Sequence, residues 1–445
     1  MLSDLALTGD QFEEIVTPIP GPRSKELGLL LREFESQGIT YLGEDFPIFW
    51  EAAKGANVRD SDGNRYIDLT AAFGVANTGH TNSYVASALT DQAVRLLHGM
   101  GDVHPPELKA QLLETLPNIL PEGLTKTILT NSGSEAVEAA LKTAYLFNKK
   151  PRVLAFTNGY HGLTYGALEV CGIEKFRTPF KDQLKNTTTF ISFPTPTIEK
   201  DHGAGRAVEA VKVALLNDPK IGAIIVEPIQ GRGGCVVPPK GFLKGLRSLC
   251  HDGDIVLILD EIYTGFARTG PMFACNNEEV VPDILLIGKA MAGGLPIAAA
   301  IGRPEIMDAW KPSTGEALYT STFLGNPMVC AAALANFGEF ERLQLAARTR
   351  QVGLALHSRL DMFRAHGAYV KDVRGRGLMW GIEMSDGATA NKLVRLALQG
   401  GVLALQSGAQ GEVVSLTPPL VITERQLFHA LDIMEDIVKR GLLHG

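Results

Sequence analysis

The sequence lacks a basic charge excess, a regular cysteine pattern and a long hydrophobic run, and each absence excludes a class of protein. The net charge is −7, whereas a nucleic-acid-binding protein would present a basic face. The five cysteines include no CxxC pair and have no regular spacing, which indicates neither a zinc site nor a disulfide framework. The longest run of small apolar residues, 290–302, contains Pro296 and is too short to cross a bilayer. The first 14 residues also lack the basic and apolar regions of a signal peptide, so we predict a cytoplasmic protein without nucleic-acid or membrane partners.

The sequence also lacks the common nucleotide-binding motifs. It contains no GxxxxGK[ST] run, which excludes the P-loop. The glycine-rich segment GRGGCV at 231–236 has neither the GxGxxG spacing nor a strand–turn–helix context, which argues against a nicotinamide dehydrogenase. The composition, with 45% hydrophobic and 20% charged residues among 445, is that of an ordinary globular protein with two or three lobes.

Between Thr125 and Gly302 the pattern alternates between strands and helices. The clearest helix is expected at 136–147, and others fit 206–216 and 240–251. The expected strands are 125–130, 151–157, 221–228, 255–260, 283–288 and 297–302. Repeated βα units of this kind predict an α/β fold with a large, doubly wound and mostly parallel sheet.

The two ends of the chain are predicted to build a smaller α/β domain. Residues 1–40 form an arm, followed by a hairpin around 60–63 and a helix at 82–98. A long helix begins near Met328, and the strands GLMWGIEM and VVSLTPP precede a closing helix at Glu424–Arg440. The predicted divisions are an N-terminal part (1–75), a large cofactor-binding domain (76–327) and a C-terminal small domain (328–445).

Two neighbouring predicted strands each end in one charged residue. Asp260 follows the apolar run 255–259, and Lys289 follows 284–288. In open α/β sheets, ligands bind beyond the carboxyl ends of such strands. Pyridoxal phosphate chemistry needs both groups, because a lysine amine holds the aldehyde as a Schiff base and a carboxylate keeps the pyridine nitrogen protonated. For either residue alone, a structural strand-end charge is the simpler interpretation.

The segment Asn131–Glu135 lies between the predicted strand 125–130 and the helix at 136–147. A small-residue turn at a helix N-terminus binds anions through free backbone N–H groups and the helix dipole. N-capping by Ser132 or Ser134 explains the same residues without a ligand, and the two interpretations are compatible.

The chain resembles the class III, or ω-type, aminotransferases, which belong to fold type I of the pyridoxal phosphate enzymes. The resemblance covers about residues 40–440. It is carried by seven motifs in order: TNSGSEAVEAALK, NGYHG, VEPIQG, LDEIYTGFARTG, IGKAMAGGLP, TSTFLGNP and VRGRGL.

The resemblance implies a role for each motif. Lys289 would hold the cofactor and shuttle protons, and Asp260 would pair with the pyridine nitrogen. Thr322 would reach the phosphate in the neighbouring subunit, which implies a homodimer with shared sites, and Arg374 would grip the substrate carboxylate. The other implied contacts are the phosphate (Gly133, Ser134), the cofactor ring (Tyr160, Ile262) and the substrate (Glu227). His161 is interpreted as structural.

The sequence departs from the family pattern at two positions. Members that act on 4-aminobutyrate, ornithine or acetylornithine usually carry an arginine after HG, where this chain has Leu163. Because leucine cannot pair with a carboxylate, we predict a substrate with an apolar or neutral tail at this position. Tyr263 replaces a glutamine that lies near the cofactor phenolic oxygen, and Phe73 falls where an aromatic residue often lines the substrate pocket.

We therefore predict a ping-pong transfer of an amino group from an amino acid, such as glutamate or alanine, to an aldehyde or ketone. Racemisation, amino transfer within one molecule and decarboxylation use the same lysine and aspartate and stay open. A catalytically silent binding or regulatory member is a further alternative, which the presence of both Lys289 and Asp260 argues against.

Overall fold

The computed structural model describes residues 7–43, 45–195 and 203–440. Its centre is a seven-stranded sheet in which five neighbouring strands run parallel and β10 runs antiparallel to both of its neighbours. The strands in sheet order are β4 (Lys126–Thr130), β10 (Ala298–Gly302), β9 (Ile284–Ile287), β8 (Val256–Asp260), β7 (Ile221–Val226), β5 (Arg152–Phe156) and β6 (Thr188–Ile191). The predicted mostly parallel sheet is confirmed, and the pattern missed only the edge strand β6.

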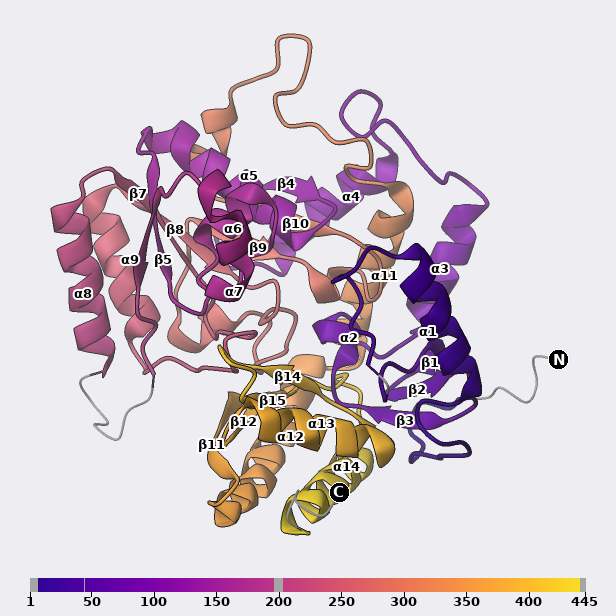
Figure 1. The fold of residues 1–445 in the computed structure, drawn as a ribbon. Coiled ribbons are helices and arrows are strands. Elements are labelled where there is room, and N and C mark those ends of the chain that lie inside the picture. Colours follow the sequence, from indigo (N-terminus) through magenta and orange to yellow (C-terminus); the bar gives the residue numbers. More distant parts are fainter. Residues whose placement is uncertain (1–6, 44, 196–202, 441–445) are drawn as a thin grey trace.

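Every residue of β7, β8, β9 and β10 is buried, because helices cover both faces of the sheet. Helix α5 (Gly133–Asn148) crosses one face and packs there through small side chains such as Ala136 and Ala140. Helices α8 (Gly203–Asn217) and α9 (Phe242–Gly253) pack against each other and cover the other face (Figure 1). Continuous burial explains why these strands read as apolar runs instead of alternating patterns.

Within the described residues, six further helices of different lengths lie around this sheet. Helix α3 ends at Ala93, five residues before the predicted end at His98, because the chain leaves the helix in a turn at Gln92–Leu96. Helix α11 begins at Pro327, as the sequence predicts near Met328, and packs on α3 and α4. The helices around the sheet are α3 (Ser83–Ala93), α4 (Glu107–Thr115), α6 (Tyr165–Val170), α7 (Glu174–Arg177), α10 (Pro304–Met307) and α11 (Pro327–Arg342).

Two four-stranded sheets stand beside the large one. The N-terminal sheet consists of β1 (Trp50–Lys54), β2 (Asn57–Asp60), β3 (Arg65–Asp68) and β13 (Val402–Leu403), so the two ends of the chain share it. The C-terminal sheet has the order β11 (Val370–Arg376), β12 (Met379–Met384), β15 (Val413–Leu416) and β14 (Leu405–Ser407). The remaining helices are α1 (Pro22–Phe34), α2 (Ala71–Gly74), α12 (Leu345–Asp361), α13 (Gly387–Gln399) and α14 (Glu424–Lys439).

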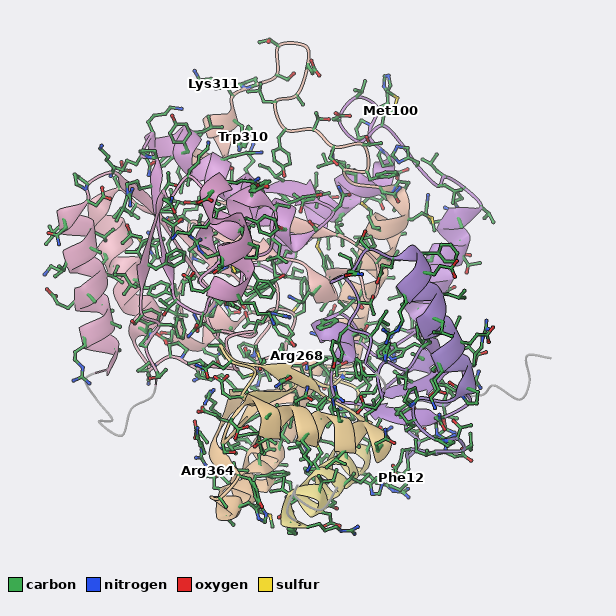
Figure 2. The ribbon with its side chains drawn as sticks, in the orientation of Figure 1. Phe12, Met100, Arg268, Trp310, Lys311 and Arg364 are labelled. Atoms are coloured by element: carbon green, nitrogen blue, oxygen red, sulfur yellow. The ribbon has the colours of Figure 1, made fainter. Side chains whose placement is uncertain are left out.

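A buried arginine ties the large sheet region to the C-terminal elements. The guanidinium of Arg268 donates hydrogen bonds to the carbonyl oxygens of Leu378 (2.9 Å) and Pro418 (2.6 Å) and to the side chain of Asn77. Arg268 is fully buried, and burial lowers its pKa to about 10. Figure 2 shows Arg268 where the two regions meet. All five cysteines are free and buried. In the described part of the chain, none of the helices has the length and apolarity to cross a membrane.

Candidate functional site

A cavity of about 680 Å³ lies beyond the carboxyl ends of β8 and β9, within the volume range of small-molecule sites. It brings together residues from most of the motifs singled out in the sequence. The residues that line it are Phe73, Gly133, Ser134, Tyr160, His161, Gly162, Leu163, Thr164, Glu227, Arg232, Asp260, Ile262, Tyr263 and Lys289.

Lys289 follows β9 directly and extends its amine into the cavity. Its backbone has φ 38°, in the left-handed region that side chains rarely adopt, and such strain concentrates at functional sites. Burial lowers the pKa of the Lys289 amine, while the charges of Asp260 and Glu227 act in the opposite direction. The Nζ atom lies 4.6 Å from the centre of the Tyr263 ring. A lowered pKa favours the neutral amine, which is the nucleophilic form.

Asp260 ends the neighbouring strand β8 and is only 4% exposed. Its Oδ1 accepts a hydrogen bond from the backbone N–H of Ile262 at 3.1 Å, and its Oδ2 lies 2.8 Å from Nδ1 of His161. Burial opposes charge on His161, but the hydrogen bond and the charge of Asp260 outweigh it and raise the histidine pKa. The histidine therefore gains a favourable interaction with the Asp260 side chain at this wall of the cavity.

The N-terminus of α5 forms a second wall. Ser132 caps the helix by accepting a hydrogen bond from Glu135 N–H, while the N–H groups of Gly133 and Ser134 make no hydrogen bond to a described residue. The Ser134 hydroxyl accepts a hydrogen bond from Thr164 N–H at 3.0 Å. At Gly162, with φ 113°, a Cβ atom would lie 2.5 Å from the Ser134 hydroxyl oxygen. The N–H groups of Gly133 and Ser134 are free to donate to an anion, and Gly162, which has no side chain, leaves the space beside Ser134 open.

Glu227 fixes two segments of the cavity at once. It lies just beyond β7, is 6% exposed, and accepts hydrogen bonds from Tyr160 N–H (2.9 Å) and Gly231 N–H (3.1 Å). Burial raises the pKa of its carboxyl to about 7; the nearby His161 charge opposes this shift and Asp260 adds to it. Both oxygens thus position backbone N–H groups, whereas the resemblance had placed Glu227 near the substrate and the carboxylate-binding arginine.

Three further predicted residues lie in the cavity wall. Ile262 packs against Gly133, where an added Cβ would lie 2.8 Å from the isoleucine Cδ1. The Tyr263 hydroxyl lies 3.0 Å from Oγ1 of Thr417, and burial raises its pKa to about 12, so the phenol stays neutral. Phe73 is 57% exposed and sits at φ 64° in the left-handed turn α2.

Two predicted residues lie outside the cavity wall. Arg374, on β11, donates from Nε to the carbonyl oxygen of Gly234 at 2.9 Å and from Nη1 to Asp372 (3.3 Å) and Glu383. Its role as the carboxylate-binding residue stays a prediction. Thr322 is exposed in the segment that precedes α11, as a residue reaching another subunit would be, and its role is a prediction as well.

The sequence interpretation missed Arg232 and Thr164, and it treated His161 only as structural. Arg232 belongs to the glycine-rich segment that was set aside for lacking a dinucleotide fingerprint. The sequence does mark Arg232, because it is the single charged residue in GRGG and directly follows the VEPIQG motif. For Thr164, the chain offers no signal beyond its closeness to the NGYHG motif.

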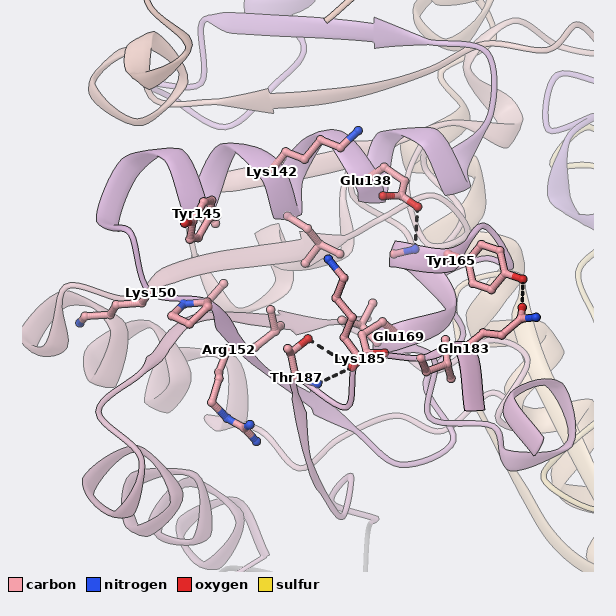
Figure 3. Close-up of a pocket in the computed structure, with 18 residues that line it drawn as sticks. Glu138, Lys142, Tyr145, Lys150, Arg152, Tyr165, Glu169, Gln183, Lys185 and Thr187 are labelled. Atoms are coloured by element: carbon pink, nitrogen blue, oxygen red, sulfur yellow. Dashed lines mark hydrogen bonds between the residues drawn. The ribbon is translucent and has the colours of Figure 1, made fainter. Parts of the chain in front are cut away.

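A second cavity, of about 640 Å³, lies behind α5 and next to α6 (Figure 3). Its acidic residues hold the local backbone, since Glu138 accepts from Gly166 N–H at 2.7 Å and Glu169 accepts from Thr187 N–H at 2.5 Å. It lies away from the strand ends that carry Lys289 and Asp260. We therefore assign the chemistry to the first cavity.

The first cavity fits pyridoxal phosphate by the chemistry of its groups. An aldehyde needs a reactive amine, a cationic pyridine ring needs a carboxylate, and a phosphate needs free N–H donors. Lys289, Asp260 and the N-terminus of α5 offer these three groups around one cavity.

Comparisons with known proteins agree with this fit. The family model described as aminotransferase class-III matches residues 41–438. The 4-aminobutyrate aminotransferase of Mycobacterium leprae is 34% identical over 96% of this chain and 98% of its own length. The alanine/serine racemase of Pyrococcus horikoshii is 32% identical over 97% of this chain and 94% of its own. Among solved structures, an amine transaminase from an uncultivated Pseudomonas species in the PLP-bound form matches with a TM-score of 0.85 and 28% identity, covering 92% of this chain and 98% of that one.

Proposed function

Because the chain belongs to the class-III aminotransferase family, a pyridoxal-phosphate-dependent family of enzymes, we propose that its cavity at Lys289 transfers an amino group from an amino acid donor to an aldehyde or ketone. Glutamate and alanine are the donors we infer from the family pattern.

The observation that carries the proposal is the placement of Lys289 and Asp260. Asp260 pairs with Leu286 across β8 and β9, and Lys289 follows three residues later, so both side chains enter the cavity from the same edge of the sheet. An amine with a lowered pKa and a buried carboxylate are thereby held on adjacent strands. A strained backbone at Lys289 fits a residue whose position is fixed for chemistry.

Each group has a distinct task in the proposed reaction. When bound, pyridoxal phosphate supplies an aldehyde that condenses with amines and a ring that accepts electrons from the substrate Cα. Lys289 would hold the cofactor and, when the substrate displaces it, its freed Nζ would accept the proton from the substrate Cα and give it back later in the transfer. Asp260, which His161 hydrogen-bonds, would keep the ring nitrogen protonated, and the N–H groups of Gly133 and Ser134 would hold the phosphate.

We further propose that the active enzyme is a homodimer with shared sites. The segment 312–326 carries the exposed side chains of Leu318 (82%) and Phe323 (57%), and Leu97 (63%) and Val103 (59%) are exposed in the loop between α3 and α4, which contacts this segment through Asn326 and Leu97. Apolar side chains exposed to this degree along two segments favour burial against another chain. Thr322 lies within this surface, where it would reach a partner's phosphate site. Light scattering coupled to size-exclusion chromatography tests this, and a monomer in the holoenzyme contradicts it.

Racemisation is the second candidate, supported by the relative named alanine/serine racemase. The two reactions differ in whether the amino group leaves. An aminotransferase bleaches the visible band of its bound cofactor when an amino donor is added and regains it with a keto acid. A racemase keeps the band and inverts the amino acid.

The experiment that tests the proposal is this absorption cycle with the purified holoenzyme. We expect L-alanine or L-glutamate to bleach the band, and pyruvate or 2-oxoglutarate to restore it. The same cycle with Lys289→Ala should show no such band in the resting protein. A band that survives every amine while the optical rotation of the amino acid decays would favour racemisation.

A further inference from the structure

The cavity wall contains a guanidinium group that the family resemblance does not explain. Arg232 and Lys289 are the arginine and the lysine among the residues that line the cavity, and His161, the histidine of the lining, is already paired with Asp260. The carboxylates of the wall already have partners, since Asp260 faces His161 and Glu227 accepts two backbone hydrogen bonds. Within the described residues, the Arg232 side chain makes neither a hydrogen bond nor an ion pair. It is therefore a cation in the cavity that lacks an anion.

The backbone holds Arg232 in place although its side chain has no ionic partner. Gln230 and Val236 exchange backbone hydrogen bonds at 3.1 and 3.0 Å and close a tight loop around it. At Gly231 an added Cβ would lie 2.3 Å from the Tyr263 ring, so the loop can approach the cavity only through glycine. The carbonyl oxygen of Arg232 also accepts a hydrogen bond from Gly408 N–H at 2.9 Å. The loop thus directs its single long side chain into the site.

Two aromatic rings lie against the guanidinium group. The Arg232 Cζ atom lies 5.5 Å from the centre of the Tyr160 ring and 5.1 Å from that of the Phe176 ring. Contact with ring faces desolvates the flat sides of a guanidinium but leaves the N–H groups at its edge free. These edge donors match a carboxylate in bidentate geometry. The same group also acts on Lys289, whose pKa it lowers, so both face a common space.

Arg374 differs from Arg232 in each of these respects. It is not among the lining residues, and its N–H groups are engaged by Gly234, Asp372 and Glu383. A carboxylate bound there would compete with two acidic side chains. The position after Gly162, where a second carboxylate would be met in some members of the resembled family, is the exposed apolar side chain of Leu163.

We propose that Arg232 binds the carboxylate of the substrate and that the substrate is an amino monocarboxylic acid with an apolar or neutral tail. The inference rests on the proposed aminotransferase function and deepens it by choosing between donors. One unpaired guanidinium accommodates one carboxylate, and Leu163 and Phe73 provide apolar wall for the rest of the molecule. Alanine and pyruvate are therefore favoured over glutamate and 2-oxoglutarate.

The test compares two substrates that differ only in the carboxylate. L-Alanine and isopropylamine share one carbon skeleton, with a methyl group in place of the carboxylate in the amine. In Arg232→Gln we expect the KM for L-alanine to rise about 10- to 100-fold, as for a lost charge-assisted pair, and that for isopropylamine to stay within about twofold. Arg232→Lys should be intermediate, because it keeps the charge but loses the bidentate geometry. The matched control is Arg23→Gln, which changes an exposed arginine outside the cavity.

A second readout does not depend on turnover. We expect butyrate, an unreactive monocarboxylate, to bind the holoenzyme in a calorimetric titration and to bind Arg232→Gln about tenfold more weakly or worse. Equal affinities overturn the inference, as does an equal loss for alanine and isopropylamine, or a loss that follows Arg374→Gln and not Arg232→Gln. A wild-type preference for glutamate overturns the monocarboxylate class. If no amino donor is turned over, the aminotransferase proposal fails, while the butyrate titration still decides whether Arg232 binds carboxylates.

Discussion

Replacing Glu227 by glutamine tests whether a buried, titrating carboxylate holds the cavity together. Burial raises its pKa from the ordinary 4.5 to about 7. The pKa of Glu227 is thus higher in the folded than in the unfolded protein. Below about pH 4.5 both states are protonated, and the group does not change the free energy of unfolding. As the pH rises from there through 7, the unfolded state releases its proton first, so the folded protein loses stability. The loss above that range is roughly 3 kcal/mol, of which roughly 2 kcal/mol falls between about pH 5.5 and 8.

The glutamine side chain removes this pH dependence and introduces a different cost. Its amide oxygen can accept from one of the two N–H groups that Glu227 holds, those of Tyr160 and Gly231. The amide nitrogen is a donor and cannot accept from the other. One buried N–H group is then left without a partner, which costs roughly 1–3 kcal/mol at every pH.

The assay is thermal unfolding of the cofactor-free protein at pH 5.5 and pH 8, at one scan rate. At pH 5.5 the free energy of unfolding of Glu227→Gln should be lower than that of the wild type. At pH 8 this difference in unfolding free energy should be smaller by roughly 2 kcal/mol. His161 is present in both proteins, so most of its own contribution to the pH dependence cancels in the comparison. Glu209→Gln, an exposed glutamate on α8, serves as control and should show no such change. If the difference in unfolding free energy between the variant and the wild type is the same at both pH values, the reasoning is refuted.

Three further changes test other parts of the structure. Arg268→Met should destabilise the protein by roughly 3–5 kcal/mol, because it leaves the buried carbonyls of Leu378 and Pro418 unpaired, and an unchanged melting temperature would contradict this tie between the regions. Leu163→Arg should raise kcat/KM for 4-aminobutyrate about tenfold or more by pairing with its carboxylate, and steady-state kinetics that show no gain would remove the role assigned to this position. Thr322→Ala should weaken pyridoxal phosphate binding about tenfold in equilibrium titrations while the dimer persists, whereas an unchanged Kd in an intact dimer would place the threonine outside the phosphate site.

Much of the fold could be predicted because its signals are local. The buried strands β7 to β10 are continuous apolar runs, and the helices between them follow a 3.6-residue pattern. The strand-end rule then brought Asp260 and Lys289 to one edge of the sheet, as the cavity shows. The edge strand β6 was missed because its half-buried, threonine-rich sequence resembles a loop.

The surroundings of each arginine were decided by tertiary structure. Arg374 pairs with Gly381 across β11 and β12, which places Glu383 as its diagonal neighbour on the same face. The resulting ion pair depends on a strand register that motif order does not specify. Arg232 reads in the sequence as part of a failed glycine motif, yet the loop closure at Gln230 and Val236 turns it toward Tyr160 and the cavity. Residue types and strand ends determined where the reactive amine and carboxylate lie, whereas long-range packing decided which cation remains free to bind substrate, because pairing depends on neighbours that are distant in the chain.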